Sequence, residues 1–144
     1  MEPDQKRVML SCLWAFVALN IAFADILSLY TPGVMPQVME GVVEGVELSE
    51  NLMLVAAIFI QIPVAMIVLT QFLSARANKV VSTIAVVIAA ALVIGGGSLM
   101  PHYVFFATCE VLALLLILRL IWRPKVLTSL NYCPISALSY RSQH

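Results

Sequence analysis

Two carboxylic acids lie inside long apolar stretches of this sequence, where a charged side chain is expensive. Asp25 belongs to the apolar run 8–30, and Glu110 belongs to the run 103–122. An aspartate in the middle of a membrane-spanning helix costs at least about 2.5 kcal/mol, so such acids usually face the inside of a helix bundle and commonly take part in function. Asp25 and Glu110 are therefore the first candidates for chemistry. The alternative is that each is a protonated, structural hydrogen-bonding group.

The two acids are expected at nearly the same depth in a membrane. An α-helix rises about 1.5 Å per residue, so Asp25 lies roughly 7–8 Å inward from Tyr30, and Glu110 lies roughly 10 Å inward from Tyr103. No Lys or Arg falls in that layer. Two carboxylates in a low dielectric without a counter-charge cannot both be ionised cheaply. They are expected to hold a proton between them, or to bind a metal ion or a cationic ligand.

Three other polar side chains are candidates for the same ligand- or proton-binding site. Asn20 and Gln61 are expected one layer deeper, where amides commonly join helices by hydrogen bonds; simple packing is the alternative for both. His102 lies at the outer end of the run 103–122 and is the nearest cation candidate. One histidine without metal-ligand spacing does not indicate a metal site, so a solvated loop residue is the alternative. The sequence leaves both metal and cofactor unassigned.

Motifs of the common enzyme classes are absent from the sequence. It has no P-loop, no G-x-G-x-x-G after a strand, no G-x-S-x-G and no H-E-x-x-H, so an enzymatic activity is not indicated. Its basic residues are dispersed, which argues against nucleic-acid binding. Cys12, Cys109 and Cys133 are expected at different depths. No disulfide is predicted, because bridged cysteines need α-carbons within about 7 Å of each other.

The elements that must position the two acids follow from the composition. Of the 144 residues, 62% are hydrophobic and 11% are charged, and the mean hydropathy is +1.00; a soluble domain has about 25% charged residues. Four apolar runs are each close to the roughly 20 residues that cross a bilayer as a helix. Short links make sequential helices antiparallel neighbours. The prediction is an all-α membrane protein, a four-helix up-down-up-down transmembrane bundle within 1–124, with helices over about 8–30, 51–73, 80–97 and 103–122.

The basic residues predict how this bundle is oriented. All eight Lys and Arg residues lie before position 8, between 74 and 79, or from 119 onwards, whereas the segment 31–50 has none and carries four glutamates. Cytoplasmic loops are enriched in Lys and Arg. Both termini are therefore predicted in the cytoplasm, with 31–50 as an outer loop, in a multi-pass protein of the cell (inner or plasma) membrane. Residues 125–144 are predicted to form a disordered cytoplasmic tail.

The first apolar run raises the question of cleavage. Ala22-Phe23-Ala24 resembles a signal-peptidase site, and Lys6-Arg7 suits a signal peptide as well as a cytoplasmic flank. The run 8–30 is 23 residues long, whereas the apolar region of a signal peptide has about 7–15 residues. The favoured prediction is therefore an uncleaved helix that keeps Asp25 inside the bundle.

Local signals describe the outer loop and the helix after it. In the segment 34–46, apolar residues recur every four positions with glutamates mainly between them. This pattern fits a short amphipathic helix on the outer face; a turn at Glu44-Gly45 with short extended arms is the alternative. Ser49 is a predicted N-cap for the helix 51–73. Pro63, in the interior of that helix, predicts a kink.

Three stretches of the chain together resemble a known family: LSCLWAFVALNIAFADILSLYTPG, LMLVAAIFIQIPVAMIVLTQFLSARANKVVSTIA and FFATCEVLALLLILRLIW. They are similar, over about residues 9–122, to the DUF6326 group of small bacterial membrane proteins of unknown function. The resemblance implies four spanning helices, with the first one retained. It places four residues on polar and proline positions of the family pattern: Asn20, Asp25, Pro63 and Glu110. The chain departs from the pattern at Gln61, where a glutamate is common, and after Pro124.

The leading functional prediction is a non-enzymatic integral membrane protein with a proton-, cation- or small-ligand-binding pocket in the outer half of the bundle. Asp25 and Glu110 would line this pocket, with Gln61 and Asn20 beneath them. Three alternatives stay open: a small proton-coupled transporter, an accessory subunit of a membrane oxidoreductase similar to the DoxX-like four-helix proteins, and a structural or assembly protein. The expected partners are the lipid bilayer and either a second copy of the chain or a membrane partner subunit.

Overall fold

The computed structural model describes residues 3–43, 45–95 and 100–122; the predicted tail over 125–144 lies outside them. Within the described residues the fold is helical, with four long helices: α1 (Pro3–Leu29), α3 (Glu50–Phe72), α4 (Ala75–Gly95) and α5 (Pro101–Trp122). Each of the four is long and apolar enough to cross a membrane. The four apolar runs of the sequence thus correspond one to one to the four long helices.

Two of these helices begin earlier than the apolar runs indicate. α1 starts at Pro3 rather than near residue 8, and α4 starts at Ala75, so the link before α4 is shorter than the predicted 74–79. The apolar pattern marks only the part of a helix that suits hydrocarbon, and the polar flanks continue the same hydrogen-bonded helix. The start of α4 is capped by Ser74, whose hydroxyl accepts the N–H of Ala77 at 3.4 Å.

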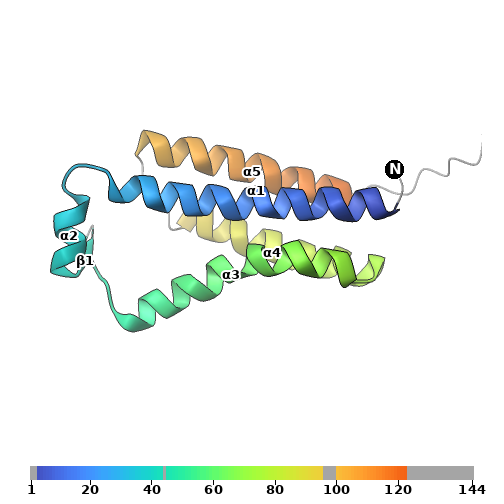
Figure 1. The fold of residues 1–144 in the computed structure, drawn as a ribbon, viewed down its shortest axis with the longest axis horizontal. Helices are drawn as coiled ribbons and strands as arrows, with labels where there is room; N and C mark the ends of the chain where they lie inside the picture. Colours follow the sequence, from blue (N-terminus) through green and yellow to red (C-terminus); the bar gives the residue numbers. More distant parts are fainter. Residues whose placement is uncertain (1–2, 44, 96–99, 123–144) are drawn as a thin grey trace, which may run out of the picture.

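The segment between α1 and α3 contains both of the structures predicted as alternatives, each over part of its length. α2 (Val34–Glu40) is a short helix between Gly33 and Gly41, whose positive φ angles of 88° and 78° favour glycine. β1 (Val42–Val43) then pairs antiparallel with β2 (Val46–Glu47). Figure 1 shows α2 and β1 together at one end of the long helices, which we call the α2 end.

The hydrophobic core lies mainly in the half of the bundle away from the α2 end. α1 packs against α3 and α5, and α4 packs against α5 and α3. Trp14 and Ile117 are fully buried at its centre, and the remaining core residues are Leu10, Val17, Met66, Ala85, Val86, Ala89, Ala113, Leu114 and Ile121. The residue type of Trp14 suggests either packing or interfacial anchoring, and its burial shows that it packs in the core.

α3 follows this core over only part of its length. Ser49 caps its start as predicted, accepting the N–H of Leu52 at 3.3 Å, but residues 51–58 are all exposed. Figure 1 shows that the first half of α3 slopes away from α1, whereas the second half runs beside the other helices. Pro63 lies between the two halves. A proline there removes one backbone hydrogen bond and crowds the preceding turn, which is a common physical cause of a helix bend.

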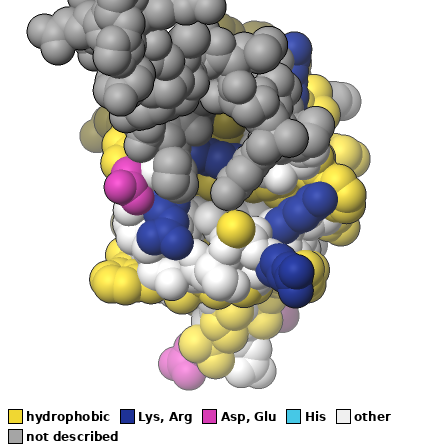
Figure 2. Space-filling model, turned by 90° about the vertical axis from the view of Figure 1, so that its right-hand side faces the viewer, with side chains coloured by type: hydrophobic (Ala, Val, Ile, Leu, Met, Phe, Trp, Pro, Cys, Tyr) yellow, Lys and Arg dark blue, Asp and Glu magenta, His cyan; other side chains and the backbone are white. Residues whose placement is uncertain are grey.

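The far end of α3 is held to α1 by polar contacts. The Arg7 guanidinium donates to the backbone carbonyls of Gln71 at 3.0 Å and of Leu73 at 3.3 Å, and Gln71 Nε2 donates to Ser11 Oγ at 2.9 Å. The last carbonyls of a helix have no donor within the helix, so Arg7 supplies what the end of α3 lacks. Figure 2, viewed onto this end, shows several Lys and Arg side chains around it, and we call it the basic end.

Candidate functional site

A cavity of about 250 Å³ lies among the four long helices, in the part of the bundle where the first half of α3 diverges. All four helices contribute to its walls, and most of the lining is apolar. Its main apolar side chains are Ile21, Phe59, Ile60, Ile62, Ile88, Leu92 and Val93, and Pro63 also lines it. The bend of α3 therefore lies in the wall of the cavity itself.

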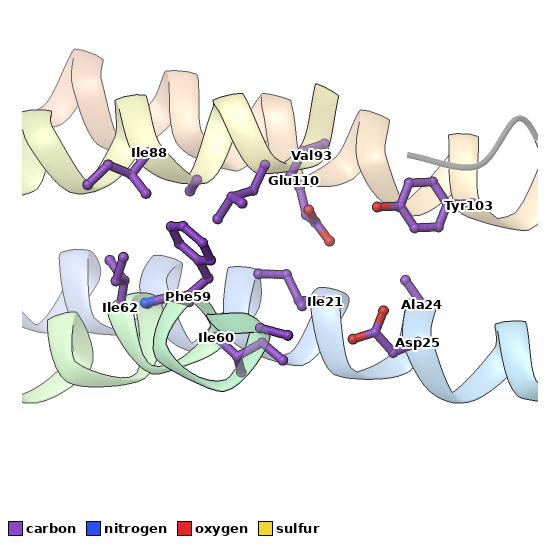
Figure 3. Close-up of a pocket in the computed structure, with 14 residues that line it drawn as sticks. Ile21, Ala24, Asp25, Phe59, Ile60, Ile62, Ile88, Val93, Tyr103 and Glu110 are labelled. Carbon is purple, nitrogen blue, oxygen red and sulfur yellow. The ribbon is translucent and has the colours of Figure 1, made fainter. Parts of the chain in front are cut away.

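Asp25, Tyr103 and Glu110 supply the polar part of the lining. Figure 3 shows Glu110 and Tyr103 projecting from α5 and Asp25 projecting from α1, with their oxygen atoms directed into the same space. Tyr103 and Glu110 are seven residues apart, close to two helical turns, so they share a face of α5. Phe59 and Ile88 lie toward the opposite side of the view. The cavity therefore has an acidic end and an apolar end.

The two carboxylates differ in their exposure. Glu110 is only 4% exposed, whereas Asp25 is exposed and stands at the rim of the cavity. Among the residues that the structure describes, neither carboxylate has a hydrogen-bond or ion-pair partner. Burying an ionised carboxylate without such a partner is costly. Glu110 is therefore a group that needs either a proton or a positively charged neighbour.

The three other candidates lie outside the lining of this cavity. Asn20 is 8% exposed, and its amide donates at 2.8 Å to the carbonyl of Phe16 in its own helix. Gln61 is exposed. His102 Nε2 lies 3.4 Å from Ser28 Oγ, a contact that joins the end of α1 to the start of α5. None of the three is among the lining residues, so the structure joins two of the five candidates and separates the rest.

Tyr103 and Phe59 line the cavity but were not predicted as site residues from the sequence. Tyr103 served there only as the reference point for the depth of Glu110. The seven-residue spacing from Tyr103 to Glu110 is the signal that could have linked this tyrosine to the site. No similar signal marks Phe59, because α3 has no distinct polar face and its sequence does not say which side lines a cavity.

The donor atoms of the cavity limit what it can hold. Nowhere in the described part of the chain do three or more His, Cys, Asp or Glu side chains come together as metal ligands. The acidic end instead offers carboxylate and phenol oxygens, which accept hydrogen bonds from N–H or O–H groups. This arrangement is suited to hold a proton or a cation that carries its own hydrogen-bond donors.

Comparison with known proteins finds one family. The family model of DUF6326, described as a family of unknown function, matches residues 1–129. The match includes all of the described residues and extends past both ends of the segment 9–122. Neither the curated proteins nor the solved structures give a match. The comparisons thus supply a family and no activity, so the function has to be argued from the site.

Proposed function

We propose that this chain, which belongs to the DUF6326 family, is a multi-pass membrane protein that binds a cation at the Asp25–Glu110 pair. The cation is either a proton or a cationic ligand. The observation that carries this proposal is the surroundings of Glu110. Its side chain is 4% exposed, lines a cavity, and has no hydrogen-bond or ion-pair partner among the described residues. Burial disfavours the ionised form of such a group, and the cavity provides space for the species that neutralises it.

Asp25 complements Glu110 in this role. It reaches the cavity from a different helix, so a cation bound beside Glu110 would lie near a second carboxyl group. Lys and Arg side chains are absent from the described lining of the cavity. The charges that face an entering ligand are therefore negative, which favours cations over anions.

The proposed arrangement in the membrane is four crossings in alternating directions, with both termini in the cytoplasm. Support comes from the described basic residues that lie at or near the basic end: Lys6, Arg7, Arg76, Lys79 and Arg119. Positive charge marks the cytoplasmic side of membrane proteins, so the cavity would lie in the outer half of the bundle. A fluorescent protein fused to the C-terminus should then be fluorescent, and alkaline phosphatase inserted after Gly41 should be active. The reverse pattern would invert the proposed orientation.

Transport is not required by this proposal. A transporter exposes its site alternately to the two sides of the membrane, and the fully buried Trp14 and Ile117 belong to the core toward the basic end. Cation binding needs only one opening. An accessory-subunit role or a purely structural role would leave the acid pair without a ligand, and these alternatives predict that neutral replacements affect assembly alone.

The test uses a hydrophobic carbodiimide, which adds to protonated carboxyl groups in apolar surroundings and leaves an N-acylurea detectable by mass spectrometry. The full-length protein is labelled in detergent from about pH 5 to about pH 9, a range that brackets carboxyl groups in unusual surroundings. Labelling of Glu110 should fall as the pH rises, because the reagent needs the protonated acid. Asp25→Asn should alter this pH dependence, whereas the matched control Glu50→Gln, in the exposed first turn of α3, should not.

Two results would contradict the proposal. The first is labelling of Glu110 that is independent of pH and of the residue at position 25. The second is failure of the Asp25→Asn, Glu110→Gln double variant to accumulate in the membrane while Glu50→Gln accumulates normally. Either result would assign the acids a structural role, since a cation-binding pair is expected to be dispensable for folding.

A further inference from the structure

We propose that the cavity binds a primary organic amine with a small apolar body; this inference rests on the proposed cation-binding function. The cavity joins an acidic end, formed by Asp25, Glu110 and Tyr103, to an apolar end formed by α3 and α4. A ligand that fills both ends carries a positive charge on one side and hydrocarbon on the other. A proton or a metal ion would use the acidic end alone.

The apolar end is lined by hydrophobic side chains that can contact the hydrocarbon part of a ligand. Phe59 and Ile60 come from α3, and Ile88 and Leu92 come from α4. In Figure 3 the ring of Phe59 extends from α3 toward the α4 side of the cavity. Removing apolar surface from water is favourable in proportion to the area covered, so an apolar body at this end adds affinity that a bare cation cannot obtain.

The size of the cavity sets the size of this body. Its volume is about 250 Å³. An apolar cavity of about 150 Å³ holds benzene, whereas sites for drug-sized ligands measure about 300–1,000 Å³. One aromatic ring or a short alkyl chain, together with an ammonium group, therefore fits the space.

The acidic end matches the hydrogen-bonding capacity of a primary ammonium group. Such a group has three N–H donors and no acceptor, and three oxygen-bearing side chains face the space: Asp25 from α1, and Glu110 and Tyr103 from α5. A quaternary ammonium has no N–H donor, and hard metal ions commonly take about six or more oxygen ligands. A quaternary ammonium would therefore leave the oxygen atoms of this end without a hydrogen-bond donor, and a metal ion would find too few oxygen ligands there.

The experiment is calorimetric titration of the full-length protein, in one detergent, with four probes of related structure. Phenethylammonium carries the charge and the ring, methylammonium only the charge, 2-phenylethanol only the ring, and Mg²⁺ is the metal ion. Phenethylammonium should bind at least about tenfold more tightly than each of the other three, a difference of about 1.4 kcal/mol. Its binding should weaken at least about tenfold in Glu110→Gln.

Variants of Phe59 separate the two ends of the cavity. Phe59→Ala should weaken phenethylammonium binding at least about fivefold and leave methylammonium unchanged, because only the first probe reaches the apolar end. Phe59→Leu, which keeps most of the apolar volume, should retain part of the affinity and guards against a folding defect. Phe105→Ala is the matched control, since Phe105 is 65% exposed and is not among the lining residues.

Each outcome bears on one proposal or on both. If methylammonium or Mg²⁺ binds as tightly as phenethylammonium, the apolar end has no part in recognition and the amine inference is wrong, while cation binding stands. If no probe binds but carbodiimide labelling of Glu110 still depends on pH, the ligand is a proton and the amine inference is again wrong. If neither probe binding nor pH dependence is found, the proposed function fails as well.

Discussion

Asp25 and Glu110 line the same cavity from different helices, yet Asp25 is exposed and Glu110 is only 4% exposed. In the proposed cation-binding function, the two acids would therefore contribute differently. A cation that enters from the more exposed side of the cavity would meet Asp25 first. Glu110 has no hydrogen-bond or ion-pair partner among the described residues, so a cation that reaches it would be its first such partner.

The difference in exposure between the two acids predicts that Asp25 affects the association rate of a ligand and Glu110 its dissociation rate. Charges at a rim mainly change association, whereas buried charge pairs mainly change dissociation. Asp25→Asn should slow association of phenethylammonium, with the larger effect at low salt, because salt screens exposed charges. Glu110→Gln should speed dissociation by about tenfold or more, the effect of losing one charged hydrogen bond. Stopped-flow measurements on both variants check this; equal effects on both rates from both variants would contradict it.

The bend of α3 predicts that Pro63 maintains the cavity. Pro63→Ala restores a helical hydrogen bond and removes the clash of the ring with the preceding turn, a gain of up to about 3 kcal/mol for a helix interior. The straighter helix should close part of the cavity. We expect a thermal unfolding midpoint equal to or above that of the unmodified protein, together with at least about threefold weaker amine binding, as measured by calorimetry.

The control for this prediction is Pro36→Ala, which replaces an exposed proline of the short helix α2. It should change neither the midpoint nor the affinity, because Pro36 is not among the cavity-lining residues. If Pro63→Ala binds the amine as well as the unmodified protein does, the shape of the cavity is independent of this proline.

The contact of Arg7 with the end of α3 predicts a stability difference between two arginines. Arg7→Ala leaves the carbonyls of Gln71 and Leu73 without their side-chain donor, and each lost hydrogen bond of this kind costs about 1 kcal/mol. Arg76, in the first turn of α4, is exposed, so Arg76→Ala should have little effect. Thermal unfolding of the two variants in detergent measures the difference, and equal midpoints would show that the Arg7 contacts do not stabilise the bundle.

The buried indole of Trp14 predicts an unusual pair of substitutions. Trp14 is 0% exposed, and its Nε1–H has no hydrogen-bond partner among the described residues. Trp14→Phe removes this unsatisfied donor, and the gain offsets part of the lost packing. The free energy of unfolding should therefore fall by only about 1 kcal/mol. Trp14→Ala has no such compensation and should cost about 3–5 kcal/mol. Phenylalanine and alanine variants of equal stability would contradict this account.

The amino-acid sequence by itself determined the four long helices and the cap of α3. A membrane-spanning helix is recognised from the length of an apolar run, and a Ser N-cap acts on a backbone N–H three residues away; both are local properties of the chain. The sequence also predicted similar depths for Asp25 and Glu110 from the rise per residue, and both residues line the same cavity. It could not choose between helix and hairpin for the segment after α1, which contains both.

Only the tertiary structure decided which polar side chains share a cavity. Asn20 is five residues from Asp25, about 140° around the same helix, so the packing of the neighbouring helices determines which of the two faces the space. Gln61 belongs to a largely apolar helix without a distinct polar face, and its exposure followed from the path of α3. The cavity itself exists where half of one helix leaves the bundle, and that depends on contacts between helices, which no local sequence pattern records.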